Sequence, residues 1–316
     1  MLLPRLVLPN FFIVGAPKAG TTSLYHQLDQ HPQVYMSPVK EPCYFASEIR
    51  PGNFEEEHQP RIKREAQELQ RYLTGSLAEK RFGGIVTEWD DYLKLFQNGT
   101  GEKAIGEASV CYLWSETAAK NIASKIPDAK IIMILRDPAE RAFSQYLHTV
   151  ADGLVRRSFR EQIELGTKNS GKFSVLHPFL EFGMYYEQVK RYIELFPREN
   201  LRIYLYEEDH ERILPDVLEF LNLDLSFMPD TAQRHLEKRV PRTITPAYFL
   251  KKYGIWQQAK EWIPGALQSL ARTAVLRERK TVTIESKDRQ YLIAYYREDV
   301  RRLANLLGRD LEAWLH

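Results

Sequence analysis

The sequence predicts an α/β fold: an open parallel sheet of the P-loop type, flanked by helices, with a helical C-terminal annex. Two observations predict it. Short apolar runs alternate with stretches of helical periodicity through the first two thirds of the chain, an order typical of parallel sheets covered on both faces. The segment 129–136, AKIIMILR, contains an unbroken apolar stretch, as central parallel strands do.

The expected elements follow in chain order. A strand at 11–15 leads into a helix from about 21 to 30, which His31-Pro32 ends. Further strands are expected at 33–36, 104–109, 129–136 and 201–208, and further helices at 115–125, 138–152, 183–196 and 210–221. Residues 55–80 are highly charged with few apolar anchors, which indicates an exposed helical insertion rather than core.

The composition is that of one globular domain over residues 1–316, with a core at about 10–225 and an annex at about 226–316. The chain has 316 residues, of which 44% are hydrophobic and 27% charged. The annex shows no clear strands, and apolar periodicity predicts a closing helix over about 286–307. A net charge of +2 argues against a nucleic-acid partner, which usually requires a basic surface.

The two cysteines, Cys43 and Cys111, are too few for a disulfide scaffold, and no CxxC or Cys/His cluster suggests a metal site. We therefore expect no metal, and we interpret both cysteines as buried packing residues. The first ten residues are too short and too rich in proline for a signal peptide or a membrane span. These features predict a soluble cytoplasmic protein.

The segment 15–24, GAPKAGTTSL, resembles a phosphate-binding loop between a strand and a helix. Gly15 and Gly20 have the spacing of the Walker loop G-x-x-x-x-G-K-[ST], but Thr21 stands where that loop has its lysine. The missing lysine favours a ligand with a shorter phosphate chain at its 5′ end. A tight turn that binds no ligand is the alternative.

The loop still offers the groups that an anion requires. Backbone amides of 18–23 can form an anion-binding nest at a helix N-terminus. Lys18 adds one cation, and Thr21, Thr22 and Ser23 add hydroxyl donors.

A second anion site is expected after the strand at 129–136. Arg136 lies at the carboxyl end of this strand, where open α/β sheets bind ligands. Asp137 and Pro138 fit the N-cap and first position of the next helix, and Ser144 lies two turns along it. An arginine and a hydroxyl at one strand–helix junction suit a phosphate monoester. In the alternative interpretations, Arg136 only pairs with Asp137 or Glu140 and Ser144 is solvated, or Asp137 is the magnesium ligand of an NTPase.

Five segments in the same order resemble the sulfotransferases that use 3′-phosphoadenosine 5′-phosphosulfate, especially the heparan-sulfate-type and bacterial branches. GAPKAGTTSL resembles the 5′-phosphosulfate loop of this family, and LRDPAERAFSQY (135–146) resembles its 3′-phosphate motif. KEPCYF (40–45), FGMYYEQVKRYIELFP (182–197) and REDVRRLANLLGRDLEAWL (297–315) resemble further family segments.

The resemblance implies a role for each matching residue. It places the 5′-phosphosulfate on the loop residues Lys18, Ala19, Gly20, Thr21, Thr22 and Ser23. It places the 3′-phosphate on Arg136 and Ser144, with Arg239 and Arg242 as further candidates in a late basic loop, RHLEKRVPRT (234–243). Glu41 falls on the glutamate that serves as base in the heparan-sulfate enzymes. Ala108 and Val110 depart from those enzymes, which have lysine and proline there, and this difference puts a heparan-type acceptor in doubt.

The expected reaction is in-line transfer of a sulfonate group from the donor to a hydroxyl or amine of the acceptor. Glu41 would accept the proton of the acceptor, and Lys18 would balance charge on the leaving phosphate. His148, one turn beyond Ser144, is the other candidate base. A small molecule, a carbohydrate, a lipid or a carrier-bound chain could be the acceptor. A P-loop nucleotide kinase or NTPase and a nucleotide-binding protein without catalysis remain as alternatives.

Overall fold

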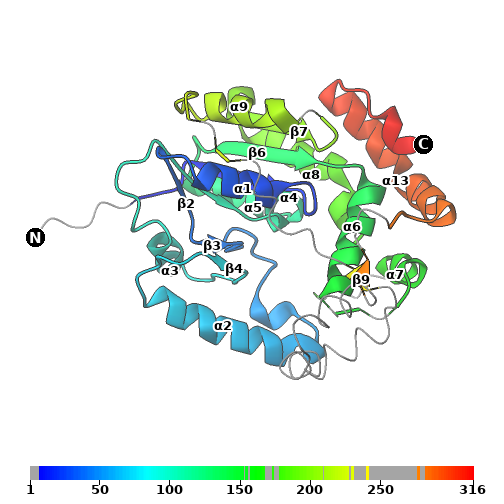
Figure 1. Cartoon of the computed structure of the whole chain (residues 1–316), viewed down its shortest axis with the longest axis horizontal. Helices are drawn as coiled ribbons and strands as arrows, with labels where there is room; N and C mark the ends of the chain where they lie inside the picture. The colour runs from blue at the N-terminus through cyan, green and yellow to red at the C-terminus, as the bar shows by residue number, and fades with distance from the viewer. Residues whose placement is uncertain are drawn as a thin grey trace, which may run out of the picture.

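The computed structural model describes residues 7–152, 154–155, 157–167, 173, 178–208, 210–227, 229–230, 240–241, 276–277 and 282–316. A five-stranded sheet lies at its centre (Figure 1). The strand order is β2 (Val34–Met36), β5 (Ala104–Ala108), β1 (Phe11–Gly15), β6 (Lys130–Leu135) and β7 (Leu201–Leu205). Every neighbouring pair is parallel. The predicted open parallel sheet is therefore confirmed.

The central strands are buried because helices cover both faces of the sheet. All residues of β1 and β5 are buried, and so are Ile131–Leu135 of β6. Gly106 in β5 has a packing reason to be glycine. A Cβ atom there would lie 2.3 Å from the ring of Phe11 on the neighbouring strand, so a larger residue would force the strands apart.

The helices lie on opposite faces because the chain reverses its direction across the sheet. The chain moves one way from β1 to β2 through α1 (Thr21–Asp29). It moves the other way from β5 to β6 through α4 (Cys111–Trp114) and α5 (Ala118–Lys125). Right-handed crossovers then place α1 on one face and α4 and α5 on the other. Helix α8 (Tyr185–Leu195) packs against α4 and α5, and α9 (His210–Phe220) follows β7.

The charged segment 55–80 forms a helix, α2 (Gln59–Leu73), but it is better anchored than the sequence suggested. Ile62, Leu69 and Leu73 are buried, and Leu69 and Leu73 belong to the main apolar cluster. Their spacing places them along one stripe of the helix, so three apolar residues are enough to fix a helix whose other residues are charged. The interpretation of the whole segment as outside the core was wrong.

Several further elements, most of them short, complete this part of the fold. They are β3 (Val39–Lys40) and β4 (Arg81–Phe82), α3 (Trp89–Lys94), α6 (Pro138–Ala151), α7 (Phe159–Gly166), and the 3₁₀ turns η1 (Pro51–Asn53), η2 (Glu56–His58), η3 (Glu181–Gly183), η4 (Arg198–Asn200) and η6 (Glu312–Leu315). An antiparallel pair, β8 (Val240–Pro241) with β9 (Leu276–Arg277), lies in the annex, where the sequence predicted no strands. Strands of two residues are too short to produce a periodic pattern.

The C-terminal helix α13 (Ser286–Leu307) has the predicted bounds and packs against α8 and α6 (Figure 1). Its buried face includes Leu292, Tyr296 and Leu303. Gly308 ends it in the left-handed conformation, at φ 61°, which glycine adopts without strain.

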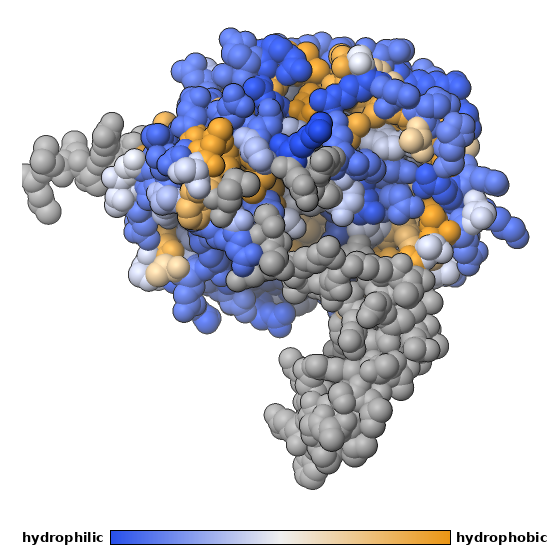
Figure 2. Space-filling view, turned by 45° about the horizontal axis from the view of Figure 1, so that its top comes forward, coloured by the Kyte–Doolittle hydropathy of each residue, from blue (hydrophilic) through white to orange (hydrophobic). Residues whose placement is uncertain are grey.

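The face of the molecule in Figure 2 is mostly hydrophilic, with apolar patches between the polar residues. Among the large apolar side chains of the described residues, that of Phe82 in β4 is the most exposed, at 56%. None of the helices in the described part of the chain is long and apolar enough to cross a membrane.

Candidate active site

Several of the predicted site residues lie where strands end, at the carboxyl edge of the sheets. The loop at 15–20 follows β1, and Arg136 follows β6. Glu41 follows the short strand β3, and Tyr206 follows β7. Parallel strands end at the same edge, so residues distant in sequence meet there.

The loop between β1 and α1 adopts a conformation that few residues tolerate. Lys18 and Gly20 both have positive φ, at 67° and 88°, and a left-handed lysine is uncommon. Gly15 must lack a side chain, because a Cβ atom would lie 2.7 Å from Cβ of Leu113. Strained backbone that is held by its surroundings is concentrated at ligand sites.

The N-terminus of α1 has its backbone donors available for a ligand. Gly20 is the N-cap residue, and no side chain of the described residues caps this helix. The first amides of a helix have no partner within it, and together with the helix dipole they attract anions. Within the loop, Ala19 and Thr21 are buried, Lys18, Gly20 and Thr22 are half-buried, and Ser23 is exposed.

Arg136 is joined to this loop. Its Nη1 donates to the carbonyl oxygen of Lys18 at 3.1 Å, and its guanidinium lies 4.7 Å from the ring centroid of Tyr206. Nη2 also lies 3.7 Å from Glu140 Oε2, so the ion pair that the alternative interpretation expected is present. The Arg136 side chain is 19% exposed. The two predicted anion sites therefore lie next to each other at one edge of the sheet.

Asp137 caps α6, as predicted. Its Oδ1 accepts from the backbone N–H groups of Ala139 and Glu140, at 2.8 and 3.2 Å. Its Oδ2 accepts from Arg289 Nη2 of α13 at 2.9 Å. Both oxygens are engaged in structural contacts, and this arrangement does not favour Asp137 as a magnesium ligand.

The structure places the other candidates differently. Ser144 is buried in α6, at 4% exposure, so it is not the solvated residue of the alternative interpretation. His148 lies in the last turn of α6, and its Nε2 is 3.7 Å from Asp152 Oδ2. His148 lies ten positions beyond Pro138, a rise of about 15 Å, so it lies far along the helix from Arg136. Arg239 and Arg242 lie outside the described residues.

Glu41 is held at the start of α4. Its Oε2 accepts from the backbone N–H of Val110 at 3.0 Å, and its Oε1 lies 3.3 Å from Nζ of Lys40. The side chain remains 28% exposed, whereas that of Lys40 is 3% exposed. A Cβ atom on Gly15 would lie 3.4 Å from the carbonyl oxygen of Val110, so Val110 lies between the carboxylate and the loop at 15–20. Glu41 is thus a half-buried carboxylate near that loop.

A buried carboxyl group supports the segment that carries Glu41. Glu107 in β5 is fully buried and accepts from the hydroxyl groups of Tyr92 and Tyr112, at 2.9 and 2.8 Å. Its Oε2 accepts from Ser109 Oγ at 2.9 Å, and Ser109 Oγ accepts from the backbone N–H of Cys43 at 3.2 Å. Burial raises the pKa of Glu107 to about 7, although the three hydrogen bonds act in the opposite direction.

Sequence reasoning did not find Glu107, Tyr206 or Arg289. Arg289 also pairs with Glu140, at 3.3 Å, and so ties α13 to the helix that follows Arg136. No motif marks these residues, because their partners are distant in the sequence. For Glu107 one signal existed: an acidic residue within an apolar strand must have buried partners.

A profile described as the sulfotransferase family matches residues 9–224. The chain belongs to the sulfotransferase family. The matched range contains all five strands of the central sheet and the residues Lys18, Glu41, Arg136 and Ser144.

Individual relatives agree with this family. The crystal structure of a sulfotransferase from Alicyclobacillus acidocaldarius is similar at a TM-score of 0.70 and 30% identity, covering 98% of this chain and 100% of that one. The human bifunctional heparan sulfate N-deacetylase/N-sulfotransferase 3 is 27% identical over 98% of this chain. Mouse carbohydrate sulfotransferase 15 is 25% identical over 68% of it. The chain spans 31% and 44% of the lengths of these two curated relatives.

Proposed function

We propose that the chain transfers a sulfonate group from 3′-phosphoadenosine 5′-phosphosulfate to a hydroxyl or amine of an acceptor. The observation that carries the proposal is the hydrogen bond between Arg136 and the carbonyl of Lys18. It joins a cation site to an uncapped helix N-terminus, so one molecule with two separate phosphate groups fits both. Membership of the sulfotransferase family supports the same donor.

In this proposal, two sets of residues bind the two phosphate-bearing ends of the donor. The amides at the start of α1, with Lys18, Thr21 and Thr22, would hold the 5′-phosphosulfate. Arg136 and Ser144 would hold the 3′-phosphate, because a guanidinium and a hydroxyl match a phosphate monoester. The donor supplies an activated sulfonate, and the positioning of the acceptor then supplies much of the acceleration.

Glu41 is the base in this proposal. As the acceptor oxygen or nitrogen forms its bond to sulfur, the bond from sulfur to the bridging oxygen breaks. Glu41 takes the proton of the acceptor, and Lys18 balances the charge that remains on the 5′-phosphate. The partial exposure of Glu41 leaves its carboxylate accessible to an acceptor.

The acceptor class to test first is carbohydrate. The printed names of two relatives refer to heparan sulfate and to carbohydrate. Small molecules, lipids and carrier-bound chains also present hydroxyl groups and form the second set. Ala108 and Val110 stand at the positions where the heparan-sulfate enzymes carry lysine and proline, which favours an acceptor other than heparan sulfate.

Calorimetric titration with adenosine 3′,5′-bisphosphate tests the donor site. We expect binding that weakens about 10- to 100-fold in Arg136→Ala, the effect of losing charge-assisted hydrogen bonds. Lys18→Ala should also weaken binding of the bisphosphate. Arg309→Ala, which changes a residue on the surface, serves as the control and should leave the affinity unchanged.

The alternative functions predict other results. ATP or GTP with magnesium, titrated in parallel, should bind less tightly than the bisphosphate. Equal binding of nucleotides with and without a 3′-phosphate would reject the sulfotransferase proposal in favour of a kinase or NTPase. Bisphosphate binding with no sulfonate transfer to any acceptor class, in wild type and Glu41→Gln alike, would indicate a binding protein without catalysis.

A further inference from the structure

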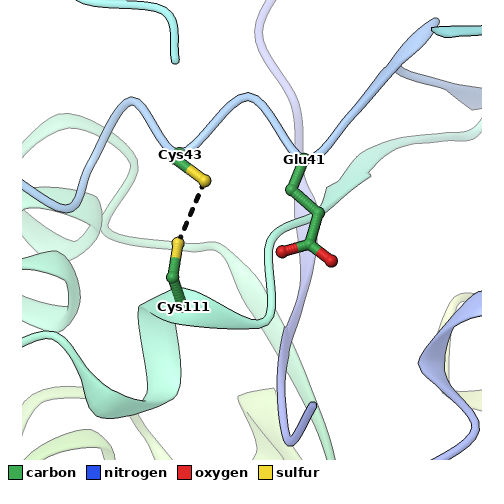
Figure 3. A group of neighbouring side chains, drawn as sticks. All are labelled: Glu41, Cys43 and Cys111. Atoms are coloured by element: carbon green, nitrogen blue, oxygen red, sulfur yellow. Dashed lines mark hydrogen bonds between the residues drawn. The ribbon is translucent and has the colours of Figure 1, made fainter. Parts of the chain in front are cut away.

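The two cysteines of the chain, 68 residues apart in sequence, meet beside Glu41. Cys43 lies two residues after Glu41, and Cys111 is the first residue of α4. The Cys111 thiol donates to Cys43 Sγ at 3.2 Å, and both residues are free thiols. Figure 3 shows the two sulfur atoms pointing toward each other, with the carboxylate of Glu41 next to them. The sequence contains only these two cysteines.

The two thiols differ in accessibility. Cys43 is half-buried, whereas Cys111 is buried at 5% exposure. Burial, and then the neighbouring Cys43, raises the pKa of the Cys111 thiol well above its ordinary value. A reagent in solution therefore reaches Cys43 first, and Cys111 is placed to attack the product.

The backbone around Cys43 is also strained. Its φ is 56°, in the left-handed region that side chains rarely adopt. The hydrogen bond from its N–H to Ser109 Oγ holds this conformation. Cys43 is therefore held in a left-handed conformation with its sulfur against a second thiol.

We propose that Cys43 and Cys111 form a modification site at which a low-molecular-weight disulfide such as oxidised glutathione installs an intramolecular disulfide. The Cys43 thiolate attacks one sulfur of the reagent, which forms a mixed disulfide and releases one thiolate. Cys111, once deprotonated, attacks the Cys43 sulfur, forms the Cys43–Cys111 bond and expels the second thiolate. The two cysteine protons pass to the two leaving thiolates, so the pair is oxidised and the reagent is reduced.

The modification would act on the proposed base. A disulfide requires sulfur atoms at about 2.05 Å, so the two sulfur atoms, now 3.2 Å apart, must approach by about 1 Å, through rotation of the side chains and movement of the segments that carry them. One of these segments carries Glu41, and the other carries the Val110 N–H that binds it. Displacement of a reacting group by about 1 Å can lower a rate by about 100-fold. This consequence rests on the proposed function, whereas the thiol chemistry does not.

The thiol chemistry is tested by incubating the full chain with oxidised glutathione, denaturing it, alkylating the remaining thiols and measuring the intact mass. Wild type should lose both alkylatable thiols, retain no glutathione and stay monomeric on a non-reducing gel. Cys111→Ser should retain one glutathione on Cys43. Cys43→Ser should keep its single thiol at the oxidant concentration that converts wild type.

Three results would overturn the proposal: two glutathione adducts on wild type, a disulfide-linked dimer as the main product, or intact wild-type thiols at an oxidant concentration that already modifies Cys111→Ser.

The effect on activity is measured in a transfer assay. We expect oxidation to lower kcat about tenfold or more, the direction that misplacement of a base predicts. Reduction with dithiothreitol should restore kcat, and the kcat of Cys43→Ser should not change on treatment with oxidised glutathione. Bisphosphate affinity should stay unchanged, because neither cysteine is among the residues that we propose to bind the bisphosphate. If the reduced protein transfers no sulfonate, the mass measurement still decides whether the disulfide forms.

Discussion

Glu107 shows how a single buried side chain couples local chemistry to stability. It lies in β5 with no exposure to solvent, and its carboxyl group accepts three hydrogen bonds. Those bonds join the aromatic core at Tyr92 and Tyr112 to the loop of Cys43 through Ser109. Glu107 is therefore a positioning residue for the segment that bears Glu41.

The pKa of Glu107 predicts a pH dependence of folding. Burial raises it from 4.5 to about 7 in the folded chain. Between these values the unfolded carboxyl group loses its proton while the folded one keeps it, so the contribution to stability is full below the window and is lost as pH rises through it. Urea unfolding of wild type on both sides of the window should show this loss.

Glu107→Gln provides the matched control. Its amide resembles the protonated carboxyl group in shape but does not titrate, so the loss between the two pH values should shrink. Glu107→Ala should be destabilised at every pH, because Tyr92 and Tyr112 lose their acceptor. A wild type and Glu107→Gln with identical pH profiles would contradict the raised pKa.

Glu41 is the residue whose replacement best tests the chemistry. We expect Glu41→Gln to lower kcat about 10²- to 10⁴-fold, the usual contribution of a general base. Bisphosphate affinity, measured by calorimetry, should remain at the wild-type value because Glu41 contacts Val110 rather than the loop at 15–20. His148→Asn is the comparison. If His148→Asn lowered kcat to that extent while Glu41→Gln stayed active, the base would be assigned to the histidine.

At the level of elements, the two helices that begin at the site differ at their N-termini. Helix α6 is capped by the Asp137 side chain. The N-cap residue of α1 is Gly20, and no side chain of the described residues caps this helix. The capped helix satisfies its own amides, and the uncapped one leaves them to a ligand. The same edge of the sheet thus carries one helix that a side chain caps and one that no side chain of the described residues caps, which is where the proposed donor would bind.

Arg289 joins α13 to α6, and this junction gives an element-scale prediction. Its guanidinium pairs with Asp137 at 2.9 Å and with Glu140 at 3.3 Å, and Asp137 is only 7% exposed. Arg289→Ala should lower the free energy of unfolding by about 1.5–3 kcal/mol, the usual cost of a lost charged hydrogen bond. Chemical denaturation measures it.

Arg309→Ala is the control for Arg289. Arg309 also pairs with a carboxylate, that of Glu208, but the two side chains are 35% and 41% exposed. Loss of this pair should therefore lower the free energy of unfolding by about 1 kcal/mol or less. Equal costs for the two variants would show that α13 is not held by this contact.

For the whole molecule, the proposed donor site predicts stabilisation by ligand. Adenosine 3′,5′-bisphosphate at about 100 times its Kd should add about 2.7 kcal/mol to the free energy of unfolding, because it binds only the folded chain. A thermal shift assay with increasing bisphosphate reads this out. Arg136→Ala should need a higher concentration for the same shift, and a shift that is identical in the variant would place the ligand elsewhere.

Much of the fold was predictable because it depends on local patterns. The five strands of the central sheet and the helix at Ser286–Leu307 came from apolar runs and periodicity. The Asp137 cap followed from the residue type and the adjacent proline. The anchoring of α2 was underestimated, because three apolar residues among many charges give a weak signal until the helix is seen against the core.

By itself the sequence determined the parallel α/β sheet, the glycine-bounded loop without a Walker lysine and the motif around Arg136, since each depends on residues close together in the chain. Only the tertiary structure decided that Arg136 contacts the Lys18 carbonyl and that Cys43 meets Cys111. These pairings depend on which strands become neighbours, and the free energy that selects them comes from burial of the whole core.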